Sequence, residues 1–210
     1  MPLAADGHHV TGVDIDAQML NRARARWQES SKSGRGTLTL MEHDLTTLAL
    51  PHRFDLVFVA LNSLLLLDGR AAQESALKVM RAHLAPGGRA VIDVWLPAQD
   101  DLVLYDGRQL LEWVRTDTET GERVAKTTIA LYSPATHSAH LTTYFDASPD
   151  DGPARRTMRE DAINFMSKDE LIALAASAGL EPVTVAGDYA LSPWSEASER
   201  VVLIARASAA

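Results

Sequence analysis

The chain has 210 residues and a formal net charge of −8 at pH 7, with 46% hydrophobic and 23% charged residues. This length and composition are typical of a single soluble globular domain. The acidic balance argues against a surface that neutralises phosphates, so we expect no nucleic-acid partner. The absence of cysteine excludes a disulfide framework, a thiolate zinc site and a cysteine nucleophile, and agrees with a cytoplasmic location. No apolar run reaches the roughly twenty residues that a membrane span needs, so we expect no membrane partner.

The first third of the chain predicts strands that alternate with helices. Residues 8–13 are expected to form a short strand, after which Asp16 is well placed to cap a helix. A second strand is expected at 37–41 and a third at 54–61. The third is almost wholly apolar, as is typical of a parallel strand buried on both faces.

A second helix is expected before a fourth strand. Ala76, Leu77, Met80 and Leu84 fall on one side of this helix. The turn "APGG" then ends the helix before the strand at 90–95.

The pattern changes after this strand. Four strands separated by turn residues such as "ETGE" and "SPDDG" are expected, at 110–116, 124–133, 138–145 and 157–165. They indicate an antiparallel insert, residues 102–165, within one domain spanning 1–210. The sequence "SKDE" then predicts a capping box from Ser167 to Glu170, and Gly179 ends the helix that it opens. Two last strands are expected at 182–187 and 200–205, which makes the fold class α/β.

Five segments together resemble the class I S-adenosylmethionine-dependent methyltransferases, over essentially the whole chain. They are "VTGVDIDAQMLNRAR", the acid of "MEHDL", "RFDLVFVALNSLLLL", "LAPGGRAVIDV" and "FMSKDELIALAASAGLEPV". The resemblance implies a Rossmann-like sheet and S-adenosyl-L-methionine as cofactor. Their order, rather than any one segment, carries the resemblance.

The resemblance also implies which residues bind the cofactor. Asp14 would accept hydrogen bonds from the two ribose hydroxyls, because a carboxylate offers two oxygens to a vicinal diol. A purely local reading makes Asp14 only a turn or helix-entry residue. The remaining positions implied for adenine, ribose and the methionine part are Ile15, Met19, Asp44, Leu45, Ala60, Leu61 and Asn62.

One feature of the family has no counterpart here. Its members begin with a strand that ends in a Gly-x-Gly-x-Gly turn, and no such segment precedes "MPLAADGHHV". The absent strand would lie between the strands at 8–13 and 54–61, so two buried strand edges would lack partners. We therefore expect an N-terminally shortened chain that binds the cofactor poorly or not at all.

The antiparallel insert is where a small-molecule acceptor is expected to bind, because additions beyond the carboxyl ends of parallel strands line the crevice in such folds. Alternation in "HLTTYF" places His140 and Tyr144 on one strand face, and these are the candidates for a catalytic role. The alternative is that this face is simply solvated. His137 and His140 lack the carboxylates that would complete a metal site, so no metal is expected.

Three functions remain open at this level. The leading one is N- or O-methylation of a small molecule, in an architecture similar to N-methyltransferases of amino sugars or amino acids. The second is a catalytically silent methyltransferase-like subunit paired with an active partner, and the third is a nicotinamide-binding Rossmann protein. A homodimer is compatible with the sequence, which does not decide the oligomeric state.

Overall fold

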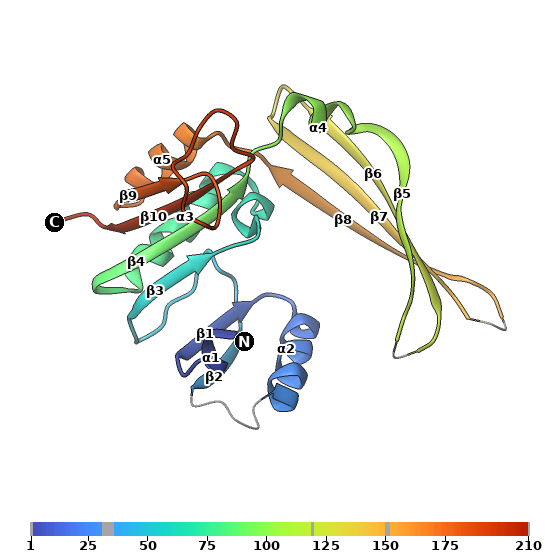
Figure 1. Ribbon diagram of the computed structural model, residues 1–210, viewed down its shortest axis with the longest axis horizontal. Helices are drawn as coiled ribbons and strands as arrows, with labels where there is room; N and C mark the ends of the chain where they lie inside the picture. The colour runs from blue at the N-terminus through green and yellow to red at the C-terminus, as the bar shows by residue number, and fades with distance from the viewer. Residues whose placement is uncertain (1, 31–35, 119, 150–151, 210) are drawn as a thin grey trace. The chain divides into compact units, whose positions relative to one another are not determined.

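The computed structural model describes residues 2–30, 36–118, 120–149 and 152–209. The chain divides into two compact units, Met1–Arg53 and Phe54–Ala210 (Figure 1). Strands and helices together confirm the predicted α/β class, and each unit has its own sheet.

The first unit contains a two-stranded parallel sheet and its helices. The elements are α1 (Pro2–Ala5), β1 (His9–Asp14), α2 (Ala17–Ser30) and β2 (Thr37–Glu42). The register of β1 and β2 runs from His9 opposite Thr37 to Asp14 opposite Glu42. The predicted cap of α2 is confirmed, because the Asp16 carboxylate accepts the backbone N–H groups of Gln18 (2.7 Å) and Met19 (3.3 Å).

The second unit contains a mixed sheet, which we call the core sheet. Its strands are β3 (Phe54–Val59), β4 (Leu84–Trp95), β10 (Arg200–Ala207) and β9 (Leu180–Ala186), in that spatial order. Strand β3 is parallel to β4, and β10 is antiparallel to both of its neighbours. The predicted terminal strand pair with an antiparallel member is therefore confirmed.

Helices cover one face of the core sheet. The short η1 (Ser63–Leu66) and α3 (Gly69–Ala82) contact β4, while α5 (Lys168–Ser177) packs on β9 and on α3. The residues of the covered face alternate along each strand, and Ile92, Val94, Val201 and Leu203 have no exposed area. The predicted capping box of α5 is present, with Ser167 and Glu170 bonding each other's backbone N–H.

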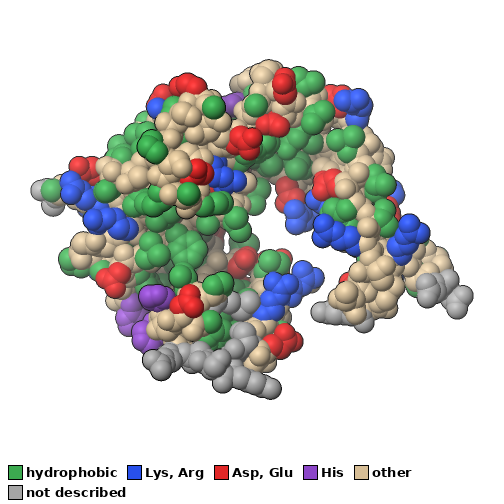
Figure 2. All heavy atoms as spheres, viewed as in Figure 1, with side chains coloured by type: hydrophobic (Ala, Val, Ile, Leu, Met, Phe, Trp, Pro, Cys, Tyr) green, Lys and Arg blue, Asp and Glu red, His purple; other side chains and the backbone are tan. Residues whose placement is uncertain are grey.

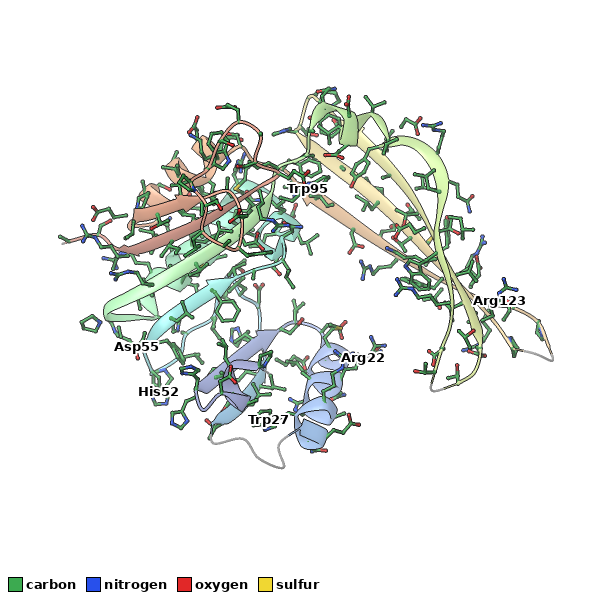
Figure 3. The ribbon with its side chains drawn as sticks, viewed as in Figure 1. Arg22, Trp27, His52, Asp55, Trp95 and Arg123 are labelled. Atoms are coloured by element: carbon green, nitrogen blue, oxygen red, sulfur yellow. The ribbon has the colours of Figure 1, made fainter. Side chains whose placement is uncertain are left out.

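A second sheet of this unit, the antiparallel sheet, joins four long strands in chain order. They are β5 (Asp106–Thr116), β6 (Arg123–Ser133), β7 (Ser138–Ser148) and β8 (Arg155–Asn164), preceded by α4 (Gln99–Val103). The predicted antiparallel pairing of this segment is confirmed. Trp95 lies where the two sheets meet (Figure 3), with its ring 5.8 Å from that of Phe165.

Two sequence-based expectations for the core sheet were wrong. Strand β3 is not buried on both faces, since Leu56 and Phe58 are 46% and 48% exposed. Within the described residues β3 is an edge strand, and its side chains alternate between the covered face and the opposite one. Strand β4 begins at Leu84 instead of residue 90, because Leu84 already pairs with Phe54 and the "APGG" turn forms an irregularity inside the ladder.

Candidate active site

The carboxyl ends of β1 and β2 carry the acids that the sequence singled out. The Asp14 Oδ1 atom accepts the backbone N–H of Asp16 at 2.9 Å, which holds the carboxylate at the strand end. Asp14 is partly exposed, and no described residue donates to its second oxygen. The turn therefore orients Asp14 and leaves acceptor capacity for a ligand.

Apolar side chains lie next to this acid in the chain. Ile15 is 73% exposed and Met19, in the first turn of α2, is 49% exposed. The neighbouring Leu20 is buried instead. Exposed apolar area beside a carboxylate suits a ligand with a flat ring and a diol.

Asp44 follows β2 and lies in the same unit. One of its oxygens accepts both the backbone N–H and the hydroxyl of Thr46, each at 2.7 Å. The backbone N–H of Thr46, followed by its hydroxyl, lowers the pKa of the Asp44 carboxyl below its usual value. Asp44 is therefore an ionised, oriented acceptor, and Leu45 beside it is partly buried.

The turn after β3, residues 60–62, has an unusual backbone. Leu61 and Asn62 have φ values of 55° and 65°, in the left-handed region that non-glycine residues rarely adopt. The Asn62 side chain accepts the backbone N–H of Trp95 at 2.7 Å, and the Ser63 hydroxyl donates to the Ala60 carbonyl at 2.8 Å. The turn is thus held to the carboxyl end of β4.

Asp93 lies beside this turn and is 2% exposed. Its carboxylate accepts the Leu61 backbone N–H. It also binds Tyr189 and Arg200, which the sequence did not indicate. These residues are 96 and 107 positions away in the chain, so no local pattern points to them.

The acceptor candidates lie along the antiparallel sheet. His140 is exposed, with Nε2 3.7 Å from a carboxylate oxygen of Glu160, and the Tyr144 ring lies 4.7 Å from the Arg156 guanidinium. Burial, followed by the charges of Asp101 and Glu112, raises the pKa of the Tyr105 phenol. A catalytic role for His140 and Tyr144 stays a prediction.

Basic side chains of this sheet lie beside acidic ones (Figure 2). Arg155 pairs with Glu122 and Arg156 with Asp146, at 2.7 Å in each case.

The chain is similar to several known proteins. Residues 1–88 match a protein family described as a methyltransferase domain. Over 207 residues the chain is 23% identical to the cypemycin N-terminal methyltransferase of a Streptomyces species, which covers 96% of this chain and 76% of that protein. The matched segment contains β1, α2 and β2, and so includes Asp14 and Asp44.

Solved structures show the same methyltransferase fold. An S-adenosylmethionine-dependent methyltransferase from Clostridium acetobutylicum matches with a TM-score of 0.78 and 15% identity, over 99% of this chain and 78% of that chain. The sugar N-methyltransferase KedS8 from a Streptoalloteichus species matches with a TM-score of 0.72 and 18% identity, over 95% of this chain and 71% of that chain. These coverages include the antiparallel sheet as well as the core sheet.

The match of residues 1–88 to a methyltransferase domain agrees with S-adenosylmethionine, the cofactor expected from the sequence. The donor chemistry of the first unit fits it, because an oriented carboxylate with a free oxygen adjoins exposed apolar side chains. In the parts of the chain that the structure describes, no group of three or more His, Asp or Glu side chains is placed to hold a metal ion. No helix of those parts is long and apolar enough to cross a membrane.

Proposed function

We propose that this methyltransferase transfers the methyl group of S-adenosylmethionine to an aliphatic amine of a small molecule, such as an amino sugar or the free N-terminus of a peptide. The observation that carries the proposal is that the two named relatives of known acceptor type act on nitrogen. One is an N-terminal methyltransferase and the other a sugar N-methyltransferase, and each matches at least 95% of this chain.

The bound S-adenosylmethionine supplies a methyl group that is already activated by a positive sulfur, so the protein mainly orients the acceptor and excludes water. The amine lone pair forms the new N–C bond while the C–S bond breaks and its electron pair stays on sulfur. The proton of the methylated ammonium passes to water. A general base is optional in this chemistry, and His140 or Tyr144 are our candidates for one.

Within the first unit, Asp14 is proposed to bind the ribose hydroxyls, and Ile15 and Met19 to cover the adenine or ribose. Asp44 and Leu45 are proposed to meet the adenine edge and its amino group. In the second unit, Ala60, Leu61 and Asn62 are proposed to meet the methionine part and the acceptor.

Amine probes test the proposed reaction. We would incubate the protein with methyl-labelled S-adenosylmethionine and either an amino-pentose glycoside or a short peptide with a free α-amine. The matched controls are the same glycoside with a hydroxyl in place of the amine, and the N-acetylated peptide. We expect label on the amines alone. Label on the hydroxyl control at an equal rate would redirect the proposal to O-methylation, and cofactor binding without any transfer would favour the silent-subunit alternative.

Asp14 and Asp16 form a matched pair that tests the cofactor site. We expect Asp14→Ala to lower the affinity for S-adenosylmethionine about tenfold to a few hundredfold, because hydrogen bonds from a diol to a carboxylate contribute about 1.5–3 kcal/mol each. Asp16→Ala should instead leave affinity unchanged and cost about 1 kcal/mol of stability, since it removes the cap of α2.

Calorimetric titration and thermal melts of both variants measure these effects. Lower stability with unchanged affinity in Asp14→Ala would mean that this acid is only a structural turn. The same titration of the unaltered chain tests the expectation of weak cofactor binding, which micromolar affinity with a cooperative melt would contradict.

A further inference from the structure

A buried carboxylate on the face of the core sheet opposite the helices joins three segments. Asp93, near the end of β4, is 2% exposed, and its Oδ1 atom accepts Arg200 Nη1 at 2.7 Å. Its Oδ2 atom accepts the Tyr189 hydroxyl at 2.7 Å and the Leu61 backbone N–H at 3.0 Å. A charge removed from water needs such partners, so the three donors explain how the carboxylate is tolerated there.

The partners of Asp93 also bind one another. Arg200 Nη1 donates to the Tyr189 hydroxyl at 2.7 Å, and the guanidinium lies 4.5 Å from the centre of the Tyr189 ring. The Tyr189 hydroxyl therefore donates to Asp93 and accepts from Arg200, which fixes the direction of the ring. Tyr189 belongs to the loop between β9 and β10, residues 187–199, dark red in Figure 1.

Packing does not explain why the turn after β3 has this conformation. Leu61 has a φ of 55° although its side chain is 78% exposed. A leucine in the left-handed region is strained, and its exposed side chain contributes little through burial. Such conformations persist where the surroundings enforce them, and they concentrate at functional sites. Here the enforcing contacts are the Leu61 N–H bond to Asp93 and the Asn62 bond to Trp95 N–H.

The network leaves apolar surface exposed beside the turn. Tyr189 is 60% exposed even though its hydroxyl has two protein partners. The Tyr189 hydroxyl and the Leu61 backbone N–H lie close together, because both donate to the same Asp93 oxygen. An aromatic ring fixed at its hydroxyl, together with an exposed leucine, suits the carbon skeleton of a small acceptor, while the charged groups are turned inward.

We propose that Asp93 is a positioning residue for methyl transfer and that Tyr189, held by it, is a wall of the acceptor site. This inference rests on the amine methylation proposed above. Asp93 acts through the Leu61 turn and the Tyr189 ring, and it does not touch the reacting atoms. The acceptor class is an amine on a compact ring or aliphatic skeleton that packs against Tyr189 and Leu61.

Two conservative variants distinguish a role in positioning the acceptor from a role in the stability of the protein. Tyr189→Phe keeps the ring and removes only the hydroxyl, and Asp93→Asn keeps the size but removes the charge. Glu181→Gln is the matched control, because Glu181 forms an exposed ion pair with Arg206 on the same sheet. For each we would measure kcat, the KM of the amino-pentose glycoside, the Kd of S-adenosylhomocysteine and the Tm.

We expect Tyr189→Phe to raise the acceptor KM about tenfold, which corresponds to losing one hydrogen bond to a charged group. Asp93→Asn should also lower kcat by at least about tenfold, because the single amide oxygen cannot accept from both Arg200 and the Leu61 turn. The Kd of S-adenosylhomocysteine should change less than about threefold in Tyr189→Phe, and Glu181→Gln should leave all kinetic values unchanged. A fall in Tm with unchanged kinetics in Tyr189→Phe would overturn the proposal.

A binding readout keeps the inference separate from the proposed reaction. In ¹⁵N-labelled protein saturated with S-adenosylhomocysteine, the glycoside should shift the amide signals of Leu61 and Tyr189, and Tyr189→Phe should weaken that binding. If these shifts occur but no methyl is transferred, the proposed reaction fails while the location of the acceptor site stands. If neither amide shifts, the inference is overturned whether or not methylation is seen.

Discussion

The core sheet and the antiparallel sheet both have four strands, yet their surroundings differ. On the covered face of the core sheet, Ile92, Val94 and Leu203 are wholly buried under α3 and α5. In the antiparallel sheet, Leu111 and Leu131 are 63% and 58% exposed. Burial of apolar area is the main stabilising contribution to folding, so most of this contribution comes from the core sheet.

Polar side-chain contacts are a larger share of the stabilising interactions in the antiparallel sheet. Thr128 and Thr143 are buried there, and Thr128 donates to Glu112, which also pairs with Lys126. Exposed ion pairs of this kind contribute about 0–1 kcal/mol each. The core sheet therefore contributes most of the stability of the fold. The surface residues of the antiparallel sheet can differ between proteins that bind different ligands.

The largest effect on stability is expected from a substitution in the core sheet. Leu203→Ala should lower the free energy of unfolding by about 2–5 kcal/mol, because it leaves a cavity at a fully buried position. Leu131→Ala, the matched change at an exposed position of the antiparallel sheet, should lower it by no more than about 0.5 kcal/mol. Urea denaturation followed by tryptophan fluorescence measures both. Similar losses in the two variants would contradict the division between the sheets.

Features set by neighbouring residues could be predicted from the sequence. Asp16 caps α2 and Ser167 forms the capping box, because both depend on residues within three positions. The four strands of the antiparallel sheet also follow from local alternation and turn residues.

Features set by distant residues could not be predicted. The bonds of Asp93 to Tyr189 and Arg200 depend on the order β4-β10-β9, which no short pattern encodes. The start of β4 at Leu84 depends likewise on its pairing with Phe54. For the candidate site, the resemblance to methyltransferases indicated Asp14 and Asp44, whereas the left-handed turn at Leu61 is visible only in three dimensions.

A smaller effect is expected from the polar contacts of the antiparallel sheet. Burial acts to raise the pKa of the Glu112 carboxyl, but the hydrogen bonds from Lys126 and Thr128 outweigh it, and the pKa is lowered. A carboxyl whose pKa is lower in the folded protein stabilises it above the unfolded pKa of about 4.3. That stabilisation is lost as the pH falls through the lower folded pKa.

Glu112→Gln should therefore lower stability at pH 7 by about 1 kcal/mol or less, since the side chain is 37% exposed. Below the folded pKa of Glu112 the two proteins should have similar stability. Melting temperatures measured from pH 7 down to pH 3 give the comparison. A difference in melting temperature that stayed constant over the whole range would show that the charge of Glu112 is not the cause.

The smallest effect on stability is expected where the antiparallel sheet is proposed to contact the acceptor. His140→Ala and Tyr144→Phe should each change the free energy of unfolding by no more than about 0.5 kcal/mol, because their polar contacts are exposed. If this face binds the amine probe, the acceptor KM should rise about twofold to tenfold, as expected for losing one hydrogen bond. The KM of S-adenosylmethionine should stay unchanged.

Thr157→Ala is the control for this face. Thr157 pairs with Phe145, so its side chain lies on the opposite face from Tyr144. Steady-state kinetics with the amino-pentose glycoside compare the three variants. A rise in acceptor KM for Thr157→Ala alone would assign the acceptor to the other face of the sheet. Unchanged KM values for all three would restrict acceptor binding to the Leu61 turn and Tyr189, because the antiparallel sheet would then affect neither stability nor recognition.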